Sequence, residues 1–451
     1  MGTTAKPPAS SRKGKILSLI KPTVDFRPFA LNTAQKLEAE AKKRHLNVSF
    51  FVGGSVAKGT NLEGDADVDV FARFDDAEYK TKSDELADLL GKIVPKDAVR
   101  VHGSRDYYQF TRNYEGSDVL FEVVPVLNIT APGQAVNVTD ASPLHVGYVL
   151  KKITAKPSLQ DEIRLAKQFC KAAKCYGAES YLNGFSGHVI DLLLIAHGSF
   201  DKLLSAATKW TPPVIIDLEK HHKSPAFAIN KSKQQGPLLL VDPIQPERNA
   251  AAAVSAEMLE RFTAAAKAYA AEKSVEVKSA KKGVTSADER FFTIFPVTKQ
   301  TITDEYERRS KTTPYATRTR LFLVEQQPFD GKDDVVATKL RKAHDYILAN
   351  AKRRGFTILD AGWEYDKKAR VAYSWFAVKV ETLSELEERA GPPARAAKDV
   401  LRFRDKHAGA FEKDGRWYAK VRRKYRTFSD FLKAMLEDSY SAERCKRSRI
   451  L

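Results

Sequence analysis

Residues 51–71 read FVGGSVAKGTNLEGDADVDVF, a glycine turn followed at a short distance by two acids inside an apolar run. Asp67 to Phe71 alternate acidic and apolar residues, which predicts a β-strand. Successive side chains on a strand point to opposite faces, so Asp67 and Asp69 share a face and lie about 6 to 7 Å apart. Paired carboxylates are suitable ligands for a hard divalent cation that also binds phosphate oxygens.

The glycine turn follows an apolar run at 47–52 that predicts a second strand. Glycines at this place let the backbone approach a phosphate closely, and we therefore include Gly54 in a nucleotide-binding site. Ser55 adds a hydroxyl group and Lys58 adds a positive charge. A glycine pair after a strand is more often only a turn, and an Asp-x-Asp pair is often a solvated face. The two features together favour the phosphate site.

Glu122 is the candidate for a third carboxylate. It lies in the apolar stretch VLFEVVP at 119–125, where a buried acid is costly unless a cation compensates its charge. Two metal ions at about 4 Å from each other need more than two acids to share. A lone glutamate in such a strand more often faces solvent, but the Asp67 and Asp69 pair reverses this preference.

These motifs resemble the polymerase β nucleotidyltransferase superfamily, and specifically the archaeal-type (class I) CCA-adding tRNA nucleotidyltransferases. The resemblance extends from about residue 20 to residue 430. Further matching motifs are RLAKQF at 164–169, YGAE at 176–179, GFSG at 184–187, GSF at 198–200, VDP at 241–243, ERNAA at 247–251, GPP at 391–393 and DGRW at 414–417.

The resemblance implies roles for single residues. Asp67, Asp69 and Glu122 fall on the Mg²⁺ ligands of the family and are the implied catalytic residues. The triphosphate contacts fall on Ser55, Lys58, His145, Lys167 and Tyr176, and Arg248 falls where the family places an arginine against the incoming base. The chain departs from the family at Glu122, where aspartate is usual, and at Lys58, where arginine is usual.

Without the resemblance these residues have ordinary interpretations. His145 would be a packed or surface histidine, Lys167 a solvated helix residue, Tyr176 a capping aromatic and Arg248 a surface arginine that opens a helix at Asn249. Lys167 and Tyr176 are about two and a half helical turns apart, so they reach one phosphate only if the helix ends between them.

The implied fold is an α+β multidomain protein. It has a polymerase β-like nucleotidyltransferase head at 1–154, a mainly helical central domain at 155–275 that binds nucleotide and base, and an α/β tRNA-binding C-terminal domain at 276–451 with a basic tail. Within these domains we expect helices at 33–43, 159–173, 187–197 with Ser186 as N-cap, 250–271 and 336–354. We expect the head sheet to end near residue 128, a linker at 273–288, and strands at 321–324, 357–359 and 372–378.

The charge of the chain agrees with a nucleic-acid partner. The 75 Lys and Arg residues exceed the 57 Asp and Glu residues by 18. Residues 391–451 hold half of this excess, since they carry 17 basic and 8 acidic residues, a difference of 9. Cations alternate with aromatic side chains here, which suits phosphates and exposed bases, although a basic run alone is more often a solvated face. The RNA-binding candidates are Arg416, Trp417, Arg422, Arg423 and Lys424.

Composition excludes several classes of protein. A chain of 451 residues with 43% hydrophobic residues builds about three folded domains. No apolar run approaches the ~20 residues of a membrane span, so we expect no membrane partner. The three cysteines show no metal-binding spacing and fit a reducing cytoplasm. A homodimer remains open.

The activity that follows is template-independent addition of CCA to the 3′ end of tRNA, with CTP and ATP as substrates and release of pyrophosphate. Two alternatives remain at this point. One is a poly(A)-type or oligoadenylate-type polymerase that uses ATP alone and continues to add nucleotides. The other is an RNA-binding protein with an inactive transferase domain.

Overall fold

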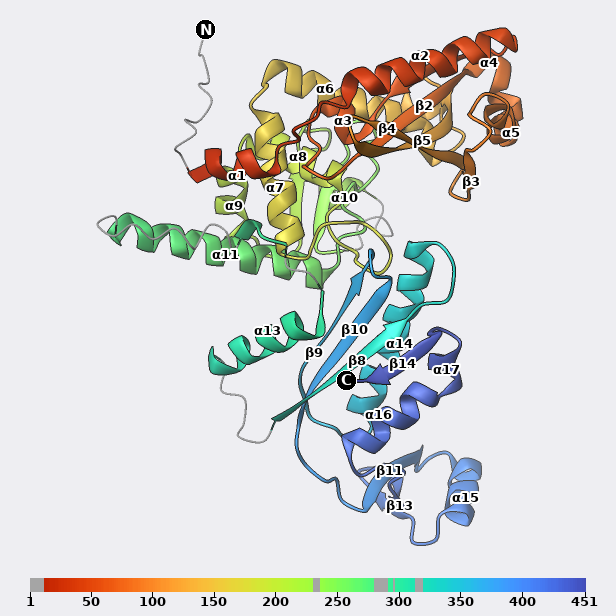
Figure 1. The fold of residues 1–451 in the computed structure, drawn as a ribbon. Helices are drawn as coiled ribbons and strands as arrows, with labels where there is room; N and C mark the ends of the chain where they lie inside the picture. The colour runs from red at the N-terminus through yellow and green to blue at the C-terminus, as the bar shows by residue number, and fades with distance from the viewer. Residues whose placement is uncertain (1–11, 230–235, 280–290, 295–296, 313–318) are drawn as a thin grey trace. The chain divides into compact units, whose positions relative to one another are not determined.

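The computed structural model describes residues 12–229, 236–279, 291–294, 297–312 and 319–451. The chain forms two compact units, Met1–Ile294 and Phe295–Leu451 (Figure 1). None of the described helices is long and apolar enough to cross a membrane.

The first unit begins with a five-stranded sheet in the order β1-β2-β5-β4-β3. β2 and β5 are parallel, and the other neighbours are antiparallel. The strands are β1 (Val48–Val52), β2 (Asp67–Asp75), β3 (Val99–Val101), β4 (Tyr107–Tyr114) and β5 (Ser117–Asn128). β5 ends at the residue where the sequence predicted the end of the head sheet. The short helices around the sheet are α3 (Gly54–Lys58), α4 (Asp76–Tyr79), η1 (Lys80–Glu85), α5 (Leu86–Gly91), η2 (Pro132–Gln134) and η3 (Val138–Ala141).

Helix α2 (Arg27–Lys43) packs its apolar stripe into the core of this sheet. Its buried residues Ala30, Ala34, Leu37 and Ala41 recur at helical spacing. The predicted start at residue 33 was wrong, because Pro28 lies in the first turn, where its fixed φ favours a helix start and no amide hydrogen is needed.

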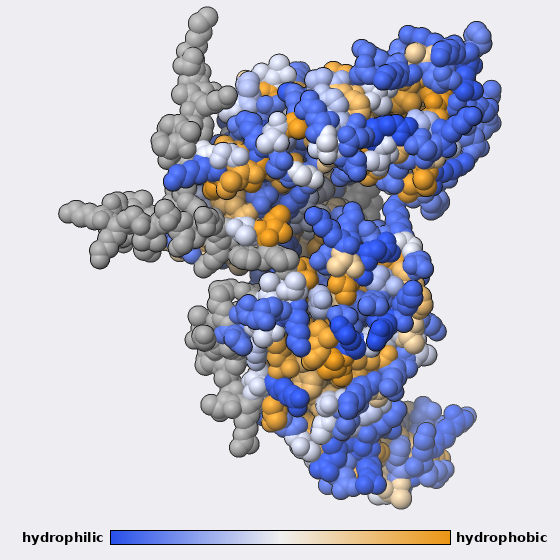
Figure 2. Space-filling view, viewed as in Figure 1, coloured by the Kyte–Doolittle hydropathy of each residue, from blue (hydrophilic) through white to orange (hydrophobic). Residues whose placement is uncertain are grey.

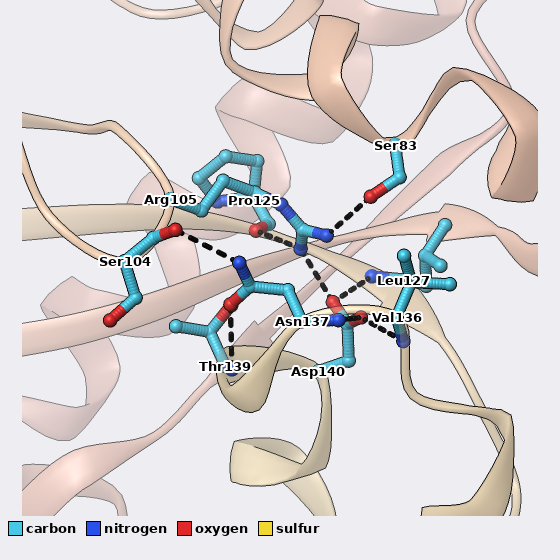
Figure 3. Close-up of polar contacts among 9 residues, drawn as sticks. All are labelled: Ser83, Ser104, Arg105, Pro125, Leu127, Val136, Asn137, Thr139 and Asp140. Carbon is cyan, nitrogen blue, oxygen red and sulfur yellow. Dashed lines mark hydrogen bonds and ion pairs between the residues drawn. The ribbon is translucent and has the colours of Figure 1, made fainter.

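A buried ion pair joins four parts of the head. Arg105 donates from Nη1 to Asp140 Oδ1 at 2.5 Å and to the Pro125 carbonyl at 3.1 Å, and from Nη2 to Ser83 Oγ at 2.8 Å (Figure 3). The Asp140 carboxylate also accepts from the backbone amides of Leu127, Val136 and Asn137. The loop before β4 is thereby tied to η1, β5 and η3.

Helices dominate the rest of the first unit, as predicted. They are α1 (Arg12–Ile20), α6 (Ser142–Ala155), α7 (Leu159–Ala172), α8 (Gly187–His197), α9 (Phe200–Ala207), α10 (Pro225–Ala228) and α11 (Ala256–Ser279). Ser186 caps α8 by accepting the amide hydrogen of Val189, as predicted. The strands β6 (Val214–Asp217) and β7 (Leu238–Val241) form a parallel pair that the sequence analysis missed.

The predicted helix at 250–271 was wrong at its start. Asn249 does not open a helix, because its side-chain oxygen accepts the amides of Leu240 and Ala251 and its backbone pairs with Val241. Helix α11 therefore begins only at Ala256. The predicted linker was also wrong in its first part, since α11 continues to Ser279, and residues 280–288 lie outside the described part of the chain.

The second unit has a four-stranded sheet in the order β14-β8-β10-β9 and a three-stranded sheet in the order β11-β13-β12. β8 (Thr319–Gln327), β10 (Val371–Lys379) and α14 (Asp333–Arg353) match the predicted elements within three residues at each end. β9 (Ile358–Asp366) begins at the predicted strand but continues seven residues beyond its predicted end. The sequence analysis did not predict α13 (Lys299–Thr312), β11 (Leu386–Pro393), α15 (Ala397–Lys406), β12 (Phe411–Lys413), β13 (Arg416–Arg422), α16 (Phe428–Glu437), α17 (Ser439–Ala442) or β14 (Arg447–Ile450).

The Arg105–Asp140 pair gives a stability prediction. We expect Asp140→Asn to lower the free energy of opening of β5 by about 3 kcal/mol, because it leaves the buried Arg105 guanidinium without its counter-ion. Amide hydrogen exchange of β5 measures this opening. The control is Asp97→Asn, which removes a partly exposed pair with Arg112 and should cost less than about 1 kcal/mol. Equal effects of the two variants would contradict the prediction.

Candidate functional site

The glycine turn lies directly against the acid strand. The Gly53 amide donates to the Asp69 carbonyl at 2.8 Å, and Gly54 opens α3 with φ of +62°. A Cβ atom built on Gly54 would lie 1.7 Å from Asp69 Oδ2. The position therefore requires glycine for both its backbone angle and its space, and Ser55 follows it in α3.

The three candidate acids come from the two parallel strands of the head sheet. Asp69 lies opposite Glu122 in the β2–β5 register, and Asp67 lies two residues earlier on β2. Glu122 Oε1 accepts a hydrogen bond of 2.5 Å from Gln109 Nε2 on β4. Asp69 is half-buried as a residue, but burial of its carboxylate, with the charges of Glu122 and Asp67, raises its pKa to about 6.

This donor set fits divalent cations. Carboxylate oxygens are the preferred ligands of Mg²⁺, and strand register brings Asp69 and Glu122 side by side. Burial and the charges of Glu122 and Asp67 raise the pKa of Asp69, and a bound cation would favour its ionised form. The longer Glu122 side chain is held by Gln109.

Lys58 connects the glycine turn to the central helices. Its Nζ donates to Asp191 Oδ2 on α8 at 2.5 Å, and both side chains are almost fully buried. The chain folds back here because α3 ends at Gly59, which adopts φ of +64°. Lys58 therefore sits between the head and α8, in direct contact with the Asp191 carboxylate, and its charge also acts on Asp69.

The structure brings Lys167 and Tyr176 together. Helix α7 ends at Ala172, between the two residues, as their joint role required. A Cβ atom on Gly187 would lie 3.2 Å from Tyr176 Oη and 3.8 Å from Lys167 Nζ. Lys167 Nζ also donates to the carbonyl and the hydroxyl of Thr60, each at 3.1 Å. Burial lowers the pKa of Lys167 to about 8 and raises that of Tyr176.

His145 and Arg248 share one acid, Asp242. His145 Nε2 lies 2.9 Å from Asp242 Oδ2, and Arg248 Nη1 donates to the same oxygen at 2.6 Å. Asp242 Oδ1 accepts the amides of Ile244 and Gln245. Burial alone would raise the pKa of Asp242, but the hydrogen bond and charge of His145 lower it. His145, which is predicted to contact phosphate, and Arg248, which is predicted to contact the base, thus share Asp242 as a hydrogen-bond partner.

His145, His188 and Asp242 also place possible metal-ligand atoms within 4.8 Å of one another. A hydrogen-bond network explains this trio better than a metal ion. Both oxygens of Asp242 already accept several hydrogen bonds, and a cation would have to displace Arg248. Burial lowers the pKa of His188 to about 4, so this imidazole is neutral at neutral pH.

Models of known families match three parts of the chain. A nucleotidyltransferase domain matches residues 34–122, the second domain of tRNA nucleotidyltransferase matches 161–278, and the C-terminal domain of CCA-adding enzyme matches 318–443. The CCA-adding enzyme of Nanoarchaeum equitans is 31% identical over 385 residues, which cover 84% of this chain and 85% of that protein. The chain belongs to the archaeal-type CCA-adding enzymes.

Two further comparisons cover different shares of the chain. The CCA-adding enzyme of Methanosarcina mazei is 30% identical over 440 residues, covering 93% of this chain and 88% of that protein. A solved structure, E. coli MS115-1 CdnC with ATP, has 20% sequence identity and a TM-score of 0.47, covering 63% of this chain and 97% of that chain. The three family matches confirm the expected fold of head, helical second domain and C-terminal α/β domain.

The sequence analysis missed two buried acids of this CCA-adding enzyme. Asp191 lies in an apolar stretch at 189–194, and that setting was a usable signal, since an acid among apolar helix residues needs a buried partner. Asp242 was noticed only as part of the VDP motif, and no role was given to it. Each acid contacts at least one residue that was predicted to bind the nucleotide.

The RNA-binding candidates of the enzyme lie on β13 and just after it. Arg416 and Arg422 are exposed, and Trp417 packs under the Arg404 guanidinium. Arg423 is less accessible, because its Nη1 donates to Glu387 at 2.8 Å and to the Arg354 carbonyl at 2.9 Å. Lys424 is exposed and lies over the Tyr425 ring. In the view of Figure 2, mostly hydrophilic residues cover the part that carries β11, β13 and α15.

The contact between Gly54 and Asp69 gives a prediction for activity. We expect Gly54→Ala to lower the initial rate of CTP incorporation into tRNA that lacks CCA by about 10²-fold, because the new methyl group displaces the Asp69 carboxylate. Gly64→Ala is the matched control, since Gly64 also has a positive φ, of +79°, but has no atom within 4 Å of the Cβ position. It should cost only about 1 to 2 kcal/mol of stability. Full activity of Gly54→Ala would contradict the proposed site.

Proposed function

We propose that this CCA-adding enzyme transfers cytidylate and adenylate from CTP and ATP to the 3′ end of tRNA by a two-metal mechanism and without a nucleic-acid template. The observation that carries this proposal is the placement of Asp69 and Glu122 side by side, directly beneath the Gly54 turn. A triphosphate on that turn has its reacting phosphorus next to three carboxylates.

Asp67, Asp69 and Glu122 would hold two Mg²⁺ ions. When bound, magnesium would lower the pKa of the attacking 3′ hydroxyl and neutralise charge on the leaving pyrophosphate. The carboxylate of Glu122, kept in place by Gln109, orients the attacking hydroxyl and accepts its proton.

The triphosphate is positioned by residues of three elements besides the strands. Ser55 and Lys58 would approach it from α3, His145 from α6, Lys167 from α7 and Tyr176 from the segment that follows α7. Positioning and electrostatic stabilisation account for most of the catalysis in phosphoryl-transfer reactions. The rigid partners of these side chains, Asp191, Asp242 and Thr60, support such positioning.

Arg248 selects the base together with the RNA end. Its side chain is about half exposed, at 49%, while its anchor Asp242 is fully buried. A fixed guanidinium with free N–H groups can recognise the acceptor edge of a base in the absence of a template. The basic face with Arg416, Arg422 and Lys424 would bind the tRNA backbone.

The test uses purified full-length protein, Mg²⁺ and tRNA without its CCA end, with labelled CTP, ATP or both. We expect two additions with CTP alone and one adenylate after them when both nucleotides are present. Asp69→Asn should lower the rate by at least about 10²-fold, because it removes a shared cation ligand. Long tails made with ATP alone would overturn the proposed product, and an active Asp69→Asn variant would overturn the metal site.

Glu122 gives a second test of the mechanism. Glu122→Gln keeps the size of the side chain but removes its charge, so we expect a loss of at least about 10²-fold in incorporation rate. Glu122→Asp keeps the charge and should retain more activity than Glu122→Gln. The aspartate side chain is one methylene shorter, which weakens its hydrogen bond with Gln109. The control is Glu40→Gln, at an exposed α2 pair with Arg44. If Glu122→Gln were more active than Glu122→Asp, Glu122 would be excluded as a metal ligand.

A further inference from the structure

Asp191 is the buried acid that most needs an explanation. It is fully buried within an apolar stretch of α8, and its neighbours Val189, Ile190, Leu192 and Leu193 are buried as well. Oδ2 accepts the hydrogen bond from Lys58, whereas the buried Oδ1 has no hydrogen-bond partner among the described residues. A carboxylate in such a place costs stability, so packing alone does not account for it.

The groups around Asp191 are those proposed to bind the triphosphate. Its negative charge acts on Lys167 and Tyr176, in addition to the direct contact with Lys58, and on the neutral His188. Lys167 also feels Lys58, Asp65 and Lys171. Asp191 therefore contacts the Lys58 ammonium directly and acts electrostatically on Lys167.

We propose that Asp191 is a positioning residue for CCA addition, which holds the Lys58 ammonium in place and balances the charge of Lys167 so that both can receive the triphosphate. It acts through the two lysines rather than on the substrate itself. This role rests on the proposed assignment of Lys58 and Lys167 to the triphosphate.

Electrostatics supports the arrangement. Two buried ammonium groups without a nearby acid repel each other, and one of them loses its proton. With Asp191 the three groups carry one net positive charge, which favours an anionic ligand. The pKa of Lys167 is lowered to about 8, chiefly by burial; Lys58 and Lys171 contribute to this lowering, and Asp191 and Asp65 oppose it.

The first variant is Asp191→Asn in the full chain, with CTP and Mg²⁺ as the ligand. Loss of the charge-assisted hydrogen bond should weaken CTP binding by about tenfold near pH 7. In the native protein, CTP binding should weaken as the pH rises through about 8, where Lys167 loses its charge. In Asp191→Asn this weakening should begin at lower pH, because the acid that raised the pKa of Lys167 is gone.

The second variant, Lys58→Met, should shift the pH dependence in the opposite direction. Lys58 lowers the pKa of Lys167, so its removal with Asp191 in place raises that pKa. CTP binding to Lys58→Met should be weaker overall but should persist to higher pH than in the native protein. This variant also tests the proposal if Asp191→Asn does not fold.

The matched control is Asp140→Asn, at a second fully buried acid with an ion pair of the same length, 2.5 Å. It should lower stability without changing the pH dependence of CTP binding. Unchanged pH dependence in both Asp191→Asn and Lys58→Met would overturn the role of Asp191, as would equal effects of Asp191→Asn and Asp140→Asn. CCA addition by the native protein, measured in parallel, separates this failure from a failure of the proposed function.

Discussion

One polar stripe of α7 fixes the segment that joins the glycine turn to the acid strand. Gln160 Nε2 donates to the Lys58 carbonyl at 2.9 Å, Arg164 Nε to the Asn61 carbonyl at 3.1 Å, and Lys167 to Thr60. Lys171 pairs with Asp65 at 2.9 Å. The four side chains are three or four residues apart, so they share one helix face. The loop between the two halves of the catalytic motif is thus held by a helix that lies a hundred residues later in the chain.

This stripe shows which contacts hold the loop between the glycine turn and β2 in place. The strands set the register that places Asp69 opposite Glu122, and Gln109 on β4 holds the Glu122 carboxylate. Lys58 has no such support from the sheet. It lies on the short helix α3, and its direction depends on the contacts that the loop makes with α7 and α8. The central helices therefore set the direction of Lys58, while the sheet sets the register of Asp69 and Glu122.

The sequence predicted those parts of the site that strand periodicity and local motifs determine. Asp67 and Asp69 alternate with buried residues, and Ser186 caps α8, because such patterns depend on near neighbours. The sequence analysis failed where contacts between residues far apart in the chain determine the structure. The start of α11 depends on the hydrogen bonds of Asn249 to β7, and the roles of Asp191 and Asp242 depend on side chains that come from other helices. The domain limits at residues 154 and 275 remain predictions.

The lysine at position 58 also explains an unusual feature of the buried pair. An arginine there, as the family resemblance leads one to expect, could donate two parallel hydrogen bonds to the Asp191 carboxylate. Lys58 reaches only Oδ2 and leaves Oδ1 without a partner among the described residues. The ammonium keeps further N–H groups that can turn toward a phosphate, since a lysine donates in several directions while a bidentate guanidinium is fixed by its carboxylate. The unmatched oxygen of Asp191 is therefore a consequence of the single hydrogen bond that a lysine makes with this carboxylate.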